Sequence, residues 1–364
     1  MTGKERMLAA LDKKLPDHLP ATTHHVMGYF LKKYMNDCTN LEFFSQMGLD
    51  PIVWVGGCRF TDEQMDKWRL EKEVLATSPY YTERWNIHTP VKTLTMVVQA
   101  NEHTAWVTER LLKDKNDIEI LERFMPVPYA DKAAVEKEAR EHPDCLIRGT
   151  IPSLSPMGQP GCWQDLSMLY GIQDLIMETY DDPEWVKETL AMIRKKKLEY
   201  IETIAGCPYD LTELGGGDAS TTVISPAIFD EFVAPYDAPL IRRMSELGQR
   251  TVYHTCGGMM PILERLADMG PNALETFTPV EMGGDAVLSE AKKRIGDRVC
   301  IIGGFDQFHY FTGCTVEDTR RYVRRCFEDA GEGGGFIFSP SDHFFDADLD
   351  LIRAFADEAA NCRY

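Results

Sequence analysis

From residue 164 to residue 362 the chain alternates helical and strand patterns, and this alternation constrains the fold more than any other feature of the sequence. Apolar residues recur at helical spacing in stretches such as 164–180 and 184–205, and short apolar runs lie between these stretches. Alternation of this kind predicts a parallel sheet covered by helices. The expected strands are residues 207–214, 250–256, 273–278, 299–302 and 336–339, and the further helices are 226–247, 260–269, 289–295, 316–330 and 349–362.

Two more strands are expected nearer the N-terminus, at residues 21–25 and 144–149. The strand count then favours an α/β protein of the (β/α)8 TIM barrel type over a doubly wound sheet. Single barrels with insertions reach the length of this chain, so we predict one barrel domain over residues 1–364. Between residues 68 and 112 the pattern changes to short alternating runs, which predicts a small antiparallel β insertion.

Composition excludes several classes of protein. The chain has 39 Lys and Arg against 58 Asp and Glu, a net charge of −19, which argues against nucleic acid as a partner. No stretch approaches the roughly 18 apolar residues of a membrane span, and the opening lacks a signal peptide's apolar core, so we expect no membrane contact and a cytoplasmic protein. Ten Cys without a repeated spacing indicate reduced thiols rather than a disulfide framework.

The strand expected at residues 250–256 carries a candidate metal site. His254 and Cys256 are two residues apart, and alternation at period two puts both side chains on one face of a strand. An imidazole and a thiolate together suit zinc, and glycines end the strand directly after them, at the end where barrels keep their active sites. The alternative is a buried structural Cys beside a core His, because Cys is among the most buried residues.

Several segments follow one another in a recognisable order along most of the chain: Glu5–Leu11 and Pro16–Pro20, then Asp181–Val186, Ser225–Tyr236 and His254–Glu264. Together they resemble the uroporphyrinogen decarboxylase superfamily. The resemblance implies a barrel with one of two chemistries. One is the cofactor-free decarboxylation of a porphyrinogen, and the other is zinc-assisted methyl transfer to or from a corrinoid protein.

Two segments separate these chemistries. The decarboxylases place an Arg-Gln-Ala-Gly-Arg stretch after the first strand to bind propionates, whereas this chain has Thr23–Gly28, which contains no arginine. The methyltransferases carry His-x-Cys on a late strand and a further Cys after the last strand. This chain keeps His254 and Cys256, and Asp342 stands where the second Cys is expected. The resemblance therefore implies a zinc site made by His254, Cys256 and Asp342, with His343, Glu275 and Asp218 as alternatives for the third ligand.

Other polar and aromatic residues are candidates for the same site. Asp218 stands where the decarboxylases keep an acid, although an Asp after three glycines is often a turn former. Glu275 lies in an apolar run, where burial without a partner would be costly. His24 and His25 end the first expected strand, and alternation sends only one of them inward. We predict catalytic roles for Asp218, Glu275 and His25, and substrate-binding roles for His24, Trp163 and His343.

The resemblance implies a zinc-dependent methyltransferase that moves a methyl group between a small methylated substrate and a separate corrinoid protein. A separate partner is expected because no cobalamin-binding segment is evident in the chain. The insertion is similar to one in superfamily members that demethylate methoxylated compounds, which favours a methyl ether, an aromatic one included. Two alternatives stay open: a cofactor-free decarboxylase of a smaller carboxylate, and a non-catalytic small-molecule binder on the same barrel.

Overall fold

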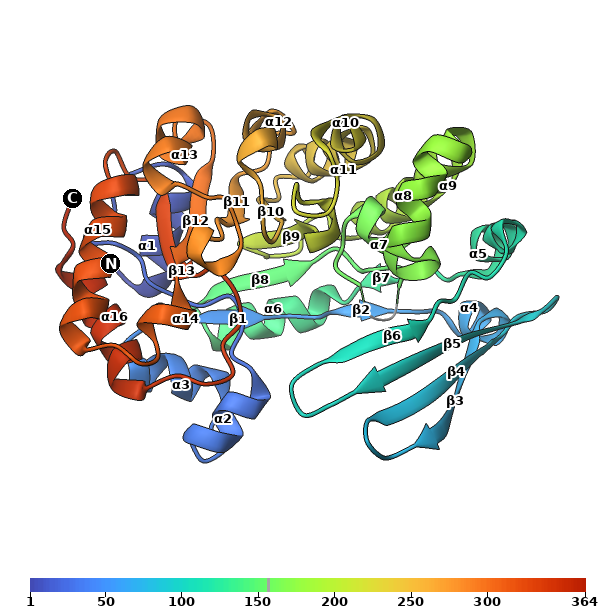
Figure 1. Ribbon diagram of the computed structural model, residues 1–364, viewed down its shortest axis with the longest axis horizontal. Coiled ribbons are helices and arrows are strands. Elements are labelled where there is room, and N and C mark those ends of the chain that lie inside the picture. Colours follow the sequence, from blue (N-terminus) through green and yellow to red (C-terminus); the bar gives the residue numbers. More distant parts are fainter. Residues whose placement is uncertain (156–157) are drawn as a thin grey trace.

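The computed structural model describes residues 1–155 and 158–364. Its centre is a parallel sheet with the strand order β1-β8-β9-β10-β11-β12-β13, in which every neighbouring pair is parallel. The sheet curls around its own axis with helices outside it (Figure 1), which confirms the expected barrel-like α/β fold. The strands are β1 (Ile52–Trp54), β8 (Leu146–Thr150), β9 (Leu211–Gly215), β10 (Thr251–His254), β11 (Ala273–Thr276), β12 (Cys300–Phe305) and β13 (Phe336–Pro340).

A short segment near the N-terminus stands between the two edge strands of this sheet. Ala21 forms a single parallel bridge with Phe338 of β13, and the N–H of Thr22 donates to the carbonyl of Phe338 over 2.9 Å. On the other side the N–H of Asp50 donates to the carbonyl of Ala21 over 2.8 Å, just before β1 begins. The strand expected at residues 21–25 is therefore reduced to one bridge, and β1 was not predicted.

The helices form the outer layer. The segment expected as one helix over residues 164–180 is two helices, which meet at Gly171 with φ of 113°, a left-handed conformation that favours glycine. The longer helices are α1 (Gly3–Leu11), α2 (Gly28–Tyr34), α3 (Asn40–Met47), α5 (Ile118–Phe124), α6 (Lys132–Glu141), α7 (Cys162–Tyr170), α8 (Ile172–Asp181), α9 (Pro183–Thr203), α11 (Ala234–Glu246), α13 (Leu288–Ile295), α15 (Val316–Ala330) and α16 (Leu349–Asn361). Shorter helices are α4 (Asp62–Lys67), α10 (Pro226–Ile228), α12 (Leu263–Asp268) and α14 (Gln307–Tyr310).

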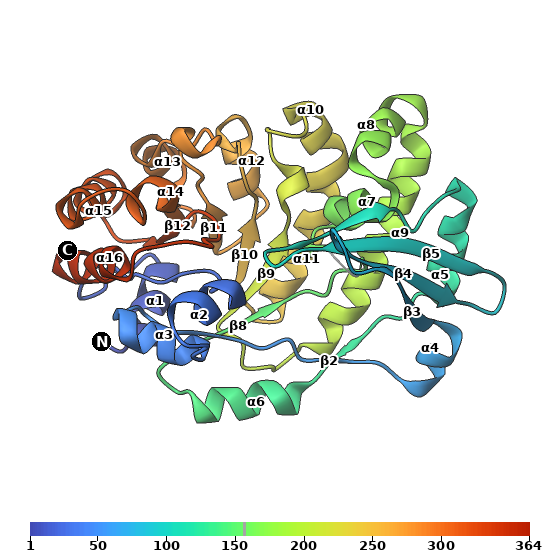
Figure 2. The same cartoon turned by 60° about the horizontal axis from the view of Figure 1, so that its bottom comes forward.

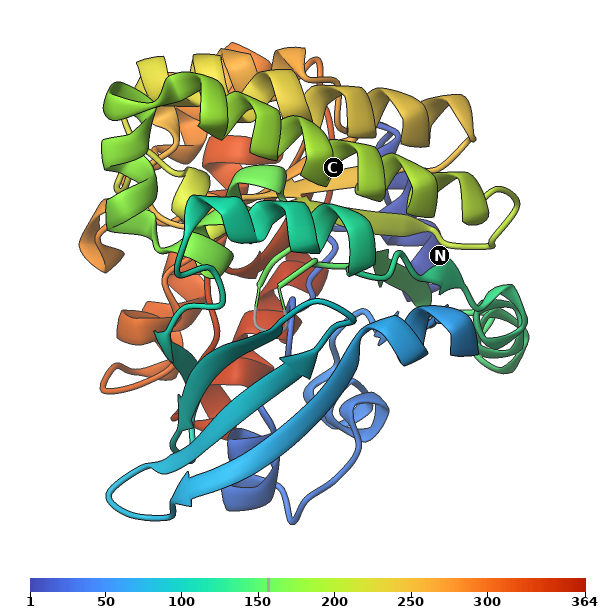
Figure 3. The same cartoon turned by 90° about the vertical axis from the view of Figure 1, so that its right-hand side faces the viewer.

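The antiparallel insertion is confirmed and lies outside the parallel sheet (Figures 2 and 3). Its strands are β3 (Arg69–Ala76), β4 (Tyr81–His88), β5 (Thr93–Ala100) and β6 (Ala105–Glu109), paired in that order. At the turn between β5 and β6 the ring of His103 contacts Tyr29 of α2 and Phe345, with centroids 4.4 and 4.9 Å away. The tip of the insertion therefore rests on the loop that follows β13.

A separate pair of short strands, β2 (Cys58–Arg59) and β7 (Tyr129–Ala130), is antiparallel. None of the helices formed by the described residues is both long enough and apolar enough to cross a membrane.

Candidate active site

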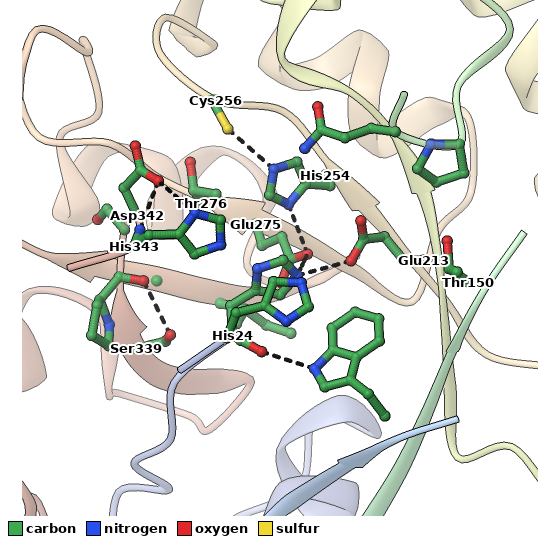
Figure 4. Close-up of a pocket in the computed structure, with 18 of the residues that line it drawn as sticks. His24, Thr150, Glu213, His254, Cys256, Glu275, Thr276, Ser339, Asp342 and His343 are labelled. Atoms are coloured by element: carbon green, nitrogen blue, oxygen red, sulfur yellow. Dashed lines mark hydrogen bonds and ion pairs between the residues drawn. The ribbon is translucent and has the colours of Figure 1, made fainter. Parts of the chain in front are cut away.

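A cavity of about 370 Å³ opens at the carboxyl ends of the parallel strands. Its wall includes side chains from β8, β9, β11 and β13, from the segments that follow β10 and β13, and from the segment after Ala21 (Figure 4). The volume lies near the lower end of the range for small-molecule sites, about 300 to 1,000 Å³. In a barrel, the position at the strands' carboxyl ends is that of the active site.

The predicted metal pair lies in this cavity. His254 ends β10 and Cys256 follows it, and the Nε2 atom of His254 is 3.1 Å from the Sγ atom of Cys256. Two ligands of a tetrahedral zinc ion are about 3.5 Å apart, so the pair is near the spacing that zinc requires. The other ring nitrogen of His254, Nδ1, is 3.0 Å from the Oε1 atom of Glu275 on the neighbouring strand β11. A carboxylate on the outer nitrogen is the usual support of a metal-binding histidine.

Below the pair lies a buried charge network from three strands. Arg148 of β8 donates to Glu213 of β9 over 2.7 Å and to Glu275 of β11 over 3.1 Å, and its guanidinium lies 4.5 Å from the centroid of the Trp54 ring. Arg148, Glu213 and Glu275 are 1%, 5% and 2% exposed. One guanidinium thus joins two buried carboxylates, and each carboxylate also lies within hydrogen-bond distance of a histidine ring nitrogen.

The charges in this network move several pKa values. Burial alone would raise the pKa of Glu213, but His24 and Arg148 outweigh burial and lower that pKa to about 2. For Glu275, Arg148 and His24 likewise outweigh burial and hold the pKa well below its usual range. Burial would lower the pKa of His254, yet the neighbouring Cys256 and Glu275 raise it well above the ordinary value. The site therefore stabilises ionised carboxylates and positive charge next to them.

Both His24 and His25 line the cavity, although alternation along a strand would have turned only one inward. The reason is that the chain leaves the sheet after its single bridge at Ala21, so strand periodicity no longer applies. The Nε2 atom of His24 is 2.9 Å from Glu213 Oε2, and the ring of His25 stacks on Trp54 with centroids 4.5 Å apart. Burial lowers the pKa of His25 to about 3, which keeps this imidazole neutral.

The loop after β13 contributes Asp342 and His343. Both line the cavity, and Asp342 is the more exposed of the two. Burial lowers the pKa of His343, and its Nε2 atom is buried without a hydrogen-bond partner among the described residues. The loop thus brings a carboxylate and a neutral imidazole to the cavity that holds His254 and Cys256.

Asp218 and Trp163 are not brought to the cavity. Trp163 is 0% exposed, and its indole N–H donates to the carbonyl of Asp218 over 3.1 Å. The Asp218 carboxylate accepts hydrogen bonds from Ser167 over 2.5 Å and from Gln164 over 3.0 Å. These hydrogen bonds connect α7 to the segment that follows β9, outside the cavity lining.

The sequence analysis missed Arg148 and Glu213. Both are charged residues inside apolar strands, the same signal that singled out Glu275. Applied to every expected strand, that signal would have found both residues. Trp54, a candidate for an aromatic pocket from the sequence, lines the cavity from β1.

The His254–Cys256 pair supplies two donors that suit zinc. Their nitrogen and sulfur atoms are close to the spacing of zinc ligands, and Glu275 supports the histidine from outside. Among the described residues, Cys256 belongs to no group of three ligand atoms that all lie within 4.8 Å of one another. Asp342 and His343 line the same cavity, and the identity of a third ligand stays open between them.

Comparisons with known proteins point to one family. The family model for uroporphyrinogen decarboxylase (URO-D) matches residues 85–361. The uroporphyrinogen decarboxylase of Neisseria meningitidis serogroup C (strain 053442) is 34% identical over 123 residues, and this match spans 32% of this chain and 32% of that protein. The uroporphyrinogen decarboxylase of Thioalkalivibrio sulfidiphilus is 23% identical over 357 residues, which are 92% of this chain and 91% of the relative.

Among solved structures, a methyltransferase from Methanosarcina mazei has the same fold. It is 17% identical in sequence, with a TM-score of 0.67, and the match covers 99% of each chain. At 17% identity, the comparison shows that the two proteins share a fold.

Proposed function

Because the chain belongs to the uroporphyrinogen decarboxylase family, we propose that it is a zinc-dependent methyltransferase of that family, which moves a methyl group between a small methylated substrate and a separate corrinoid protein. The observation that carries the proposal is the His254–Cys256 pair, 3.1 Å apart and facing a cavity of small-molecule size. The Methanosarcina mazei protein is called a methyltransferase, and we carry that activity to this chain as part of the proposal.

The chain's own residues would hold and orient the reacting groups. Glu275 accepts the Nδ1–H of His254, which turns Nε2 towards Cys256, and Arg148 in turn fixes Glu275. Zinc held there would act as a Lewis acid on the atom that carries the methyl group. The stacked rings of Trp54 and His25 form a flat part of the wall of the same cavity, and such a wall suits a planar substrate.

A methyl ether is the favoured substrate class. A ligand set with one thiolate and one carboxylate donates less charge than a set with two thiolates, so zinc bound here would be a stronger Lewis acid and better matched to oxygen. The test is to supply methoxylated aromatic compounds with reduced cobalamin and to follow methylcobalamin by absorbance. Methyl transfer that requires both protein and zinc is expected. Absence of transfer by the zinc-loaded protein across aromatic and aliphatic methyl ethers, methyl thioethers and methylamines would reject the proposal.

We expect no decarboxylation of uroporphyrinogen. The family name and the curated relatives favour that rival activity, but no Arg or Lys is among the described residues that line the cavity. Arg148 lies below the cavity and is already engaged by two carboxylates. Propionate groups would therefore lack paired donors. Carbon dioxide release from uroporphyrinogen should stay at the uncatalysed rate, and release at an enzymatic rate would favour the decarboxylase.

Asp342→Ala is expected to weaken metal binding at the His254–Cys256 pair more than His343→Ala does. Loss of a direct ligand should cost more than the roughly 10- to 100-fold in affinity that loss of an outer partner costs. Cobalt(II) titration reports this affinity, because thiolate-to-cobalt absorption arises only where cobalt contacts Cys256. The reverse order would make His343 the third ligand. If neither change affects metal binding, the third ligand must lie on another strand.

A further inference from the structure

We propose that His24, His25 and His343 form a second transition-metal site in the same cavity, separate from the His254–Cys256 pair. Each of the three histidines offers a ring nitrogen, and these nitrogens all lie within 4.8 Å of one another. The three residues come from two segments far apart in the chain, the one after Ala21 and the one after β13, and all three line the cavity. Figure 4 labels His24 and His343, one from each segment. This second site does not depend on the methyl-transfer chemistry proposed above. It does use His343, so the third ligand of the pair would then be Asp342.

His24 has the arrangement of a supported metal ligand. Its Nε2 atom is 2.9 Å from Glu213 Oε2, and its Nδ1 atom has no hydrogen bond to the part of the chain that the structure describes. A metal-binding histidine usually ties one ring nitrogen to a carboxylate, which fixes the tautomer and leaves the other nitrogen for the ion. Glu213 therefore supports the His24 ring in the same way that Glu275 supports the His254 ring.

His25 and His343 have ring nitrogens that the surrounding protein does not use. The Nε2 atom of His343 is buried without a partner, and the ring of His25 makes no hydrogen bond to the described residues. The His25 ring lies 4.1 Å from the His24 ring and 5.4 Å from the His343 ring, centroid to centroid. Buried polar atoms are normally paired, so the Nε2 atom of His343 calls for a further partner. A metal ion held by the three rings would supply that partner.

Ligand type sets the class of ion. Imidazole nitrogens suit zinc, copper, iron and nickel, whereas magnesium and calcium prefer oxygen. Three protein ligands leave at least one position for water or for a substrate oxygen, as catalytic zinc sites do. We therefore expect this ion to take an anionic oxygen of the substrate, a carboxylate or a phenolate.

The two sites differ in one chemical respect that an experiment can use. The pair site contains the sulfur of Cys256, whereas the three-histidine site contains only nitrogen donors. Cobalt(II) bound to the pair should show thiolate-to-cobalt absorption, and cobalt(II) bound to the three histidines should not. The rings of His24 and His254 have centroids 5.1 Å apart, so the two sites are neighbours and each must be removed separately.

The experiment titrates the metal-free full-length protein with cobalt(II) and, in parallel, with zinc by calorimetry. The wild-type protein should take up two equivalents. His25→Phe keeps a ring against Trp54 and should take up one, with thiolate absorption retained. Cys256→Ala should also take up one, with that absorption lost. His88→Phe is the matched control, because His88 lies in the insertion away from the cavity, and it should take up two.

Two outcomes would overturn the second site. In the first, the wild-type protein binds only one equivalent of metal, which Cys256→Ala removes and His25→Phe leaves unchanged. In the second, the wild-type protein binds one equivalent of metal, and either change removes it. That result would mean a single shared site. His343→Ala is a second variant, in case His25→Phe fails to fold. It removes a ligand of the same proposed site from the other segment. If circular dichroism shows both variants folded, they must lose the same equivalent for the proposal to stand.

Discussion

Cys256→Ala is expected to remove the ion held at the His254–Cys256 pair and to reduce methyl transfer by at least about a thousandfold, because Lewis-acid catalysis contributes several kcal/mol. The fold should persist. Cys256 lies at the end of a strand beside an open cavity, and a barrel of this size does not depend on a metal for its core, unlike a small zinc finger. Cobalt thiolate absorption, methyl-transfer rate and circular dichroism measure the three effects.

Cys58→Ala is the matched control for this prediction. Cys58 is an exposed free cysteine on β2, and it is not among the residues that line the cavity. This change should leave the absorption and the rate unchanged. If thiolate absorption survives in Cys256→Ala, Cys256 is not a metal ligand. If full activity persists without that absorption, the metal takes no part in the mechanism.

Arg148→Met is expected to destabilise the metal-free protein by about 3 to 5 kcal/mol, the usual cost of removing one partner from a buried ion pair. The guanidinium faces both Glu213 and Glu275, and all three side chains are buried. Without it, two neighbouring buried carboxylates would remain, in contact with the rings of His24 and His254. Urea unfolding of the metal-free variant and wild type, followed by circular dichroism, gives the difference in free energy.

The sign of the pH dependence follows from the same pair of carboxylates. In Arg148→Met the folded state should raise the pKa of at least one glutamate above its unfolded value, since burial and a like charge both favour the protonated form. The folded variant then binds more protons than the unfolded chain, so its stability falls as pH rises. The loss relative to wild type should be greater at pH 8 than at pH 5.

Arg353→Met is the control for this second prediction. Arg353 is 44% exposed and pairs with Asp350 on the surface of α16. Its replacement should change the free energy of unfolding by no more than about 0.5 kcal/mol. An equally small change in Arg148→Met would mean that the network is solvated or that its carboxylates are already protonated.

Much of the fold could be predicted because its signals are local. The helix-strand alternation and the antiparallel insertion follow from periodicities of a few residues. The strand expected at residues 250–256 ends at His254, so Cys256 meets His254 from the segment after β10 rather than from a shared strand face. The missed elements have weak local signals. β1 is only Ile52–Trp54, and the closing segment contributes one bridge at Ala21, so neither offers the run of residues that a pattern requires.

Sequence alone determined a barrel-like fold and one end of its site, the His254–Cys256 pair two residues apart. Only the tertiary structure decided what surrounds that pair. Arg148 and Glu275 are 127 residues apart in the chain, and His24 and Glu213 are 189 apart. Contacts over such separations depend on strand order, on parallel register and on where the closing segment leaves the sheet. No local period encodes them, because they exist only once the sheet has curled and brought its carboxyl ends around one cavity.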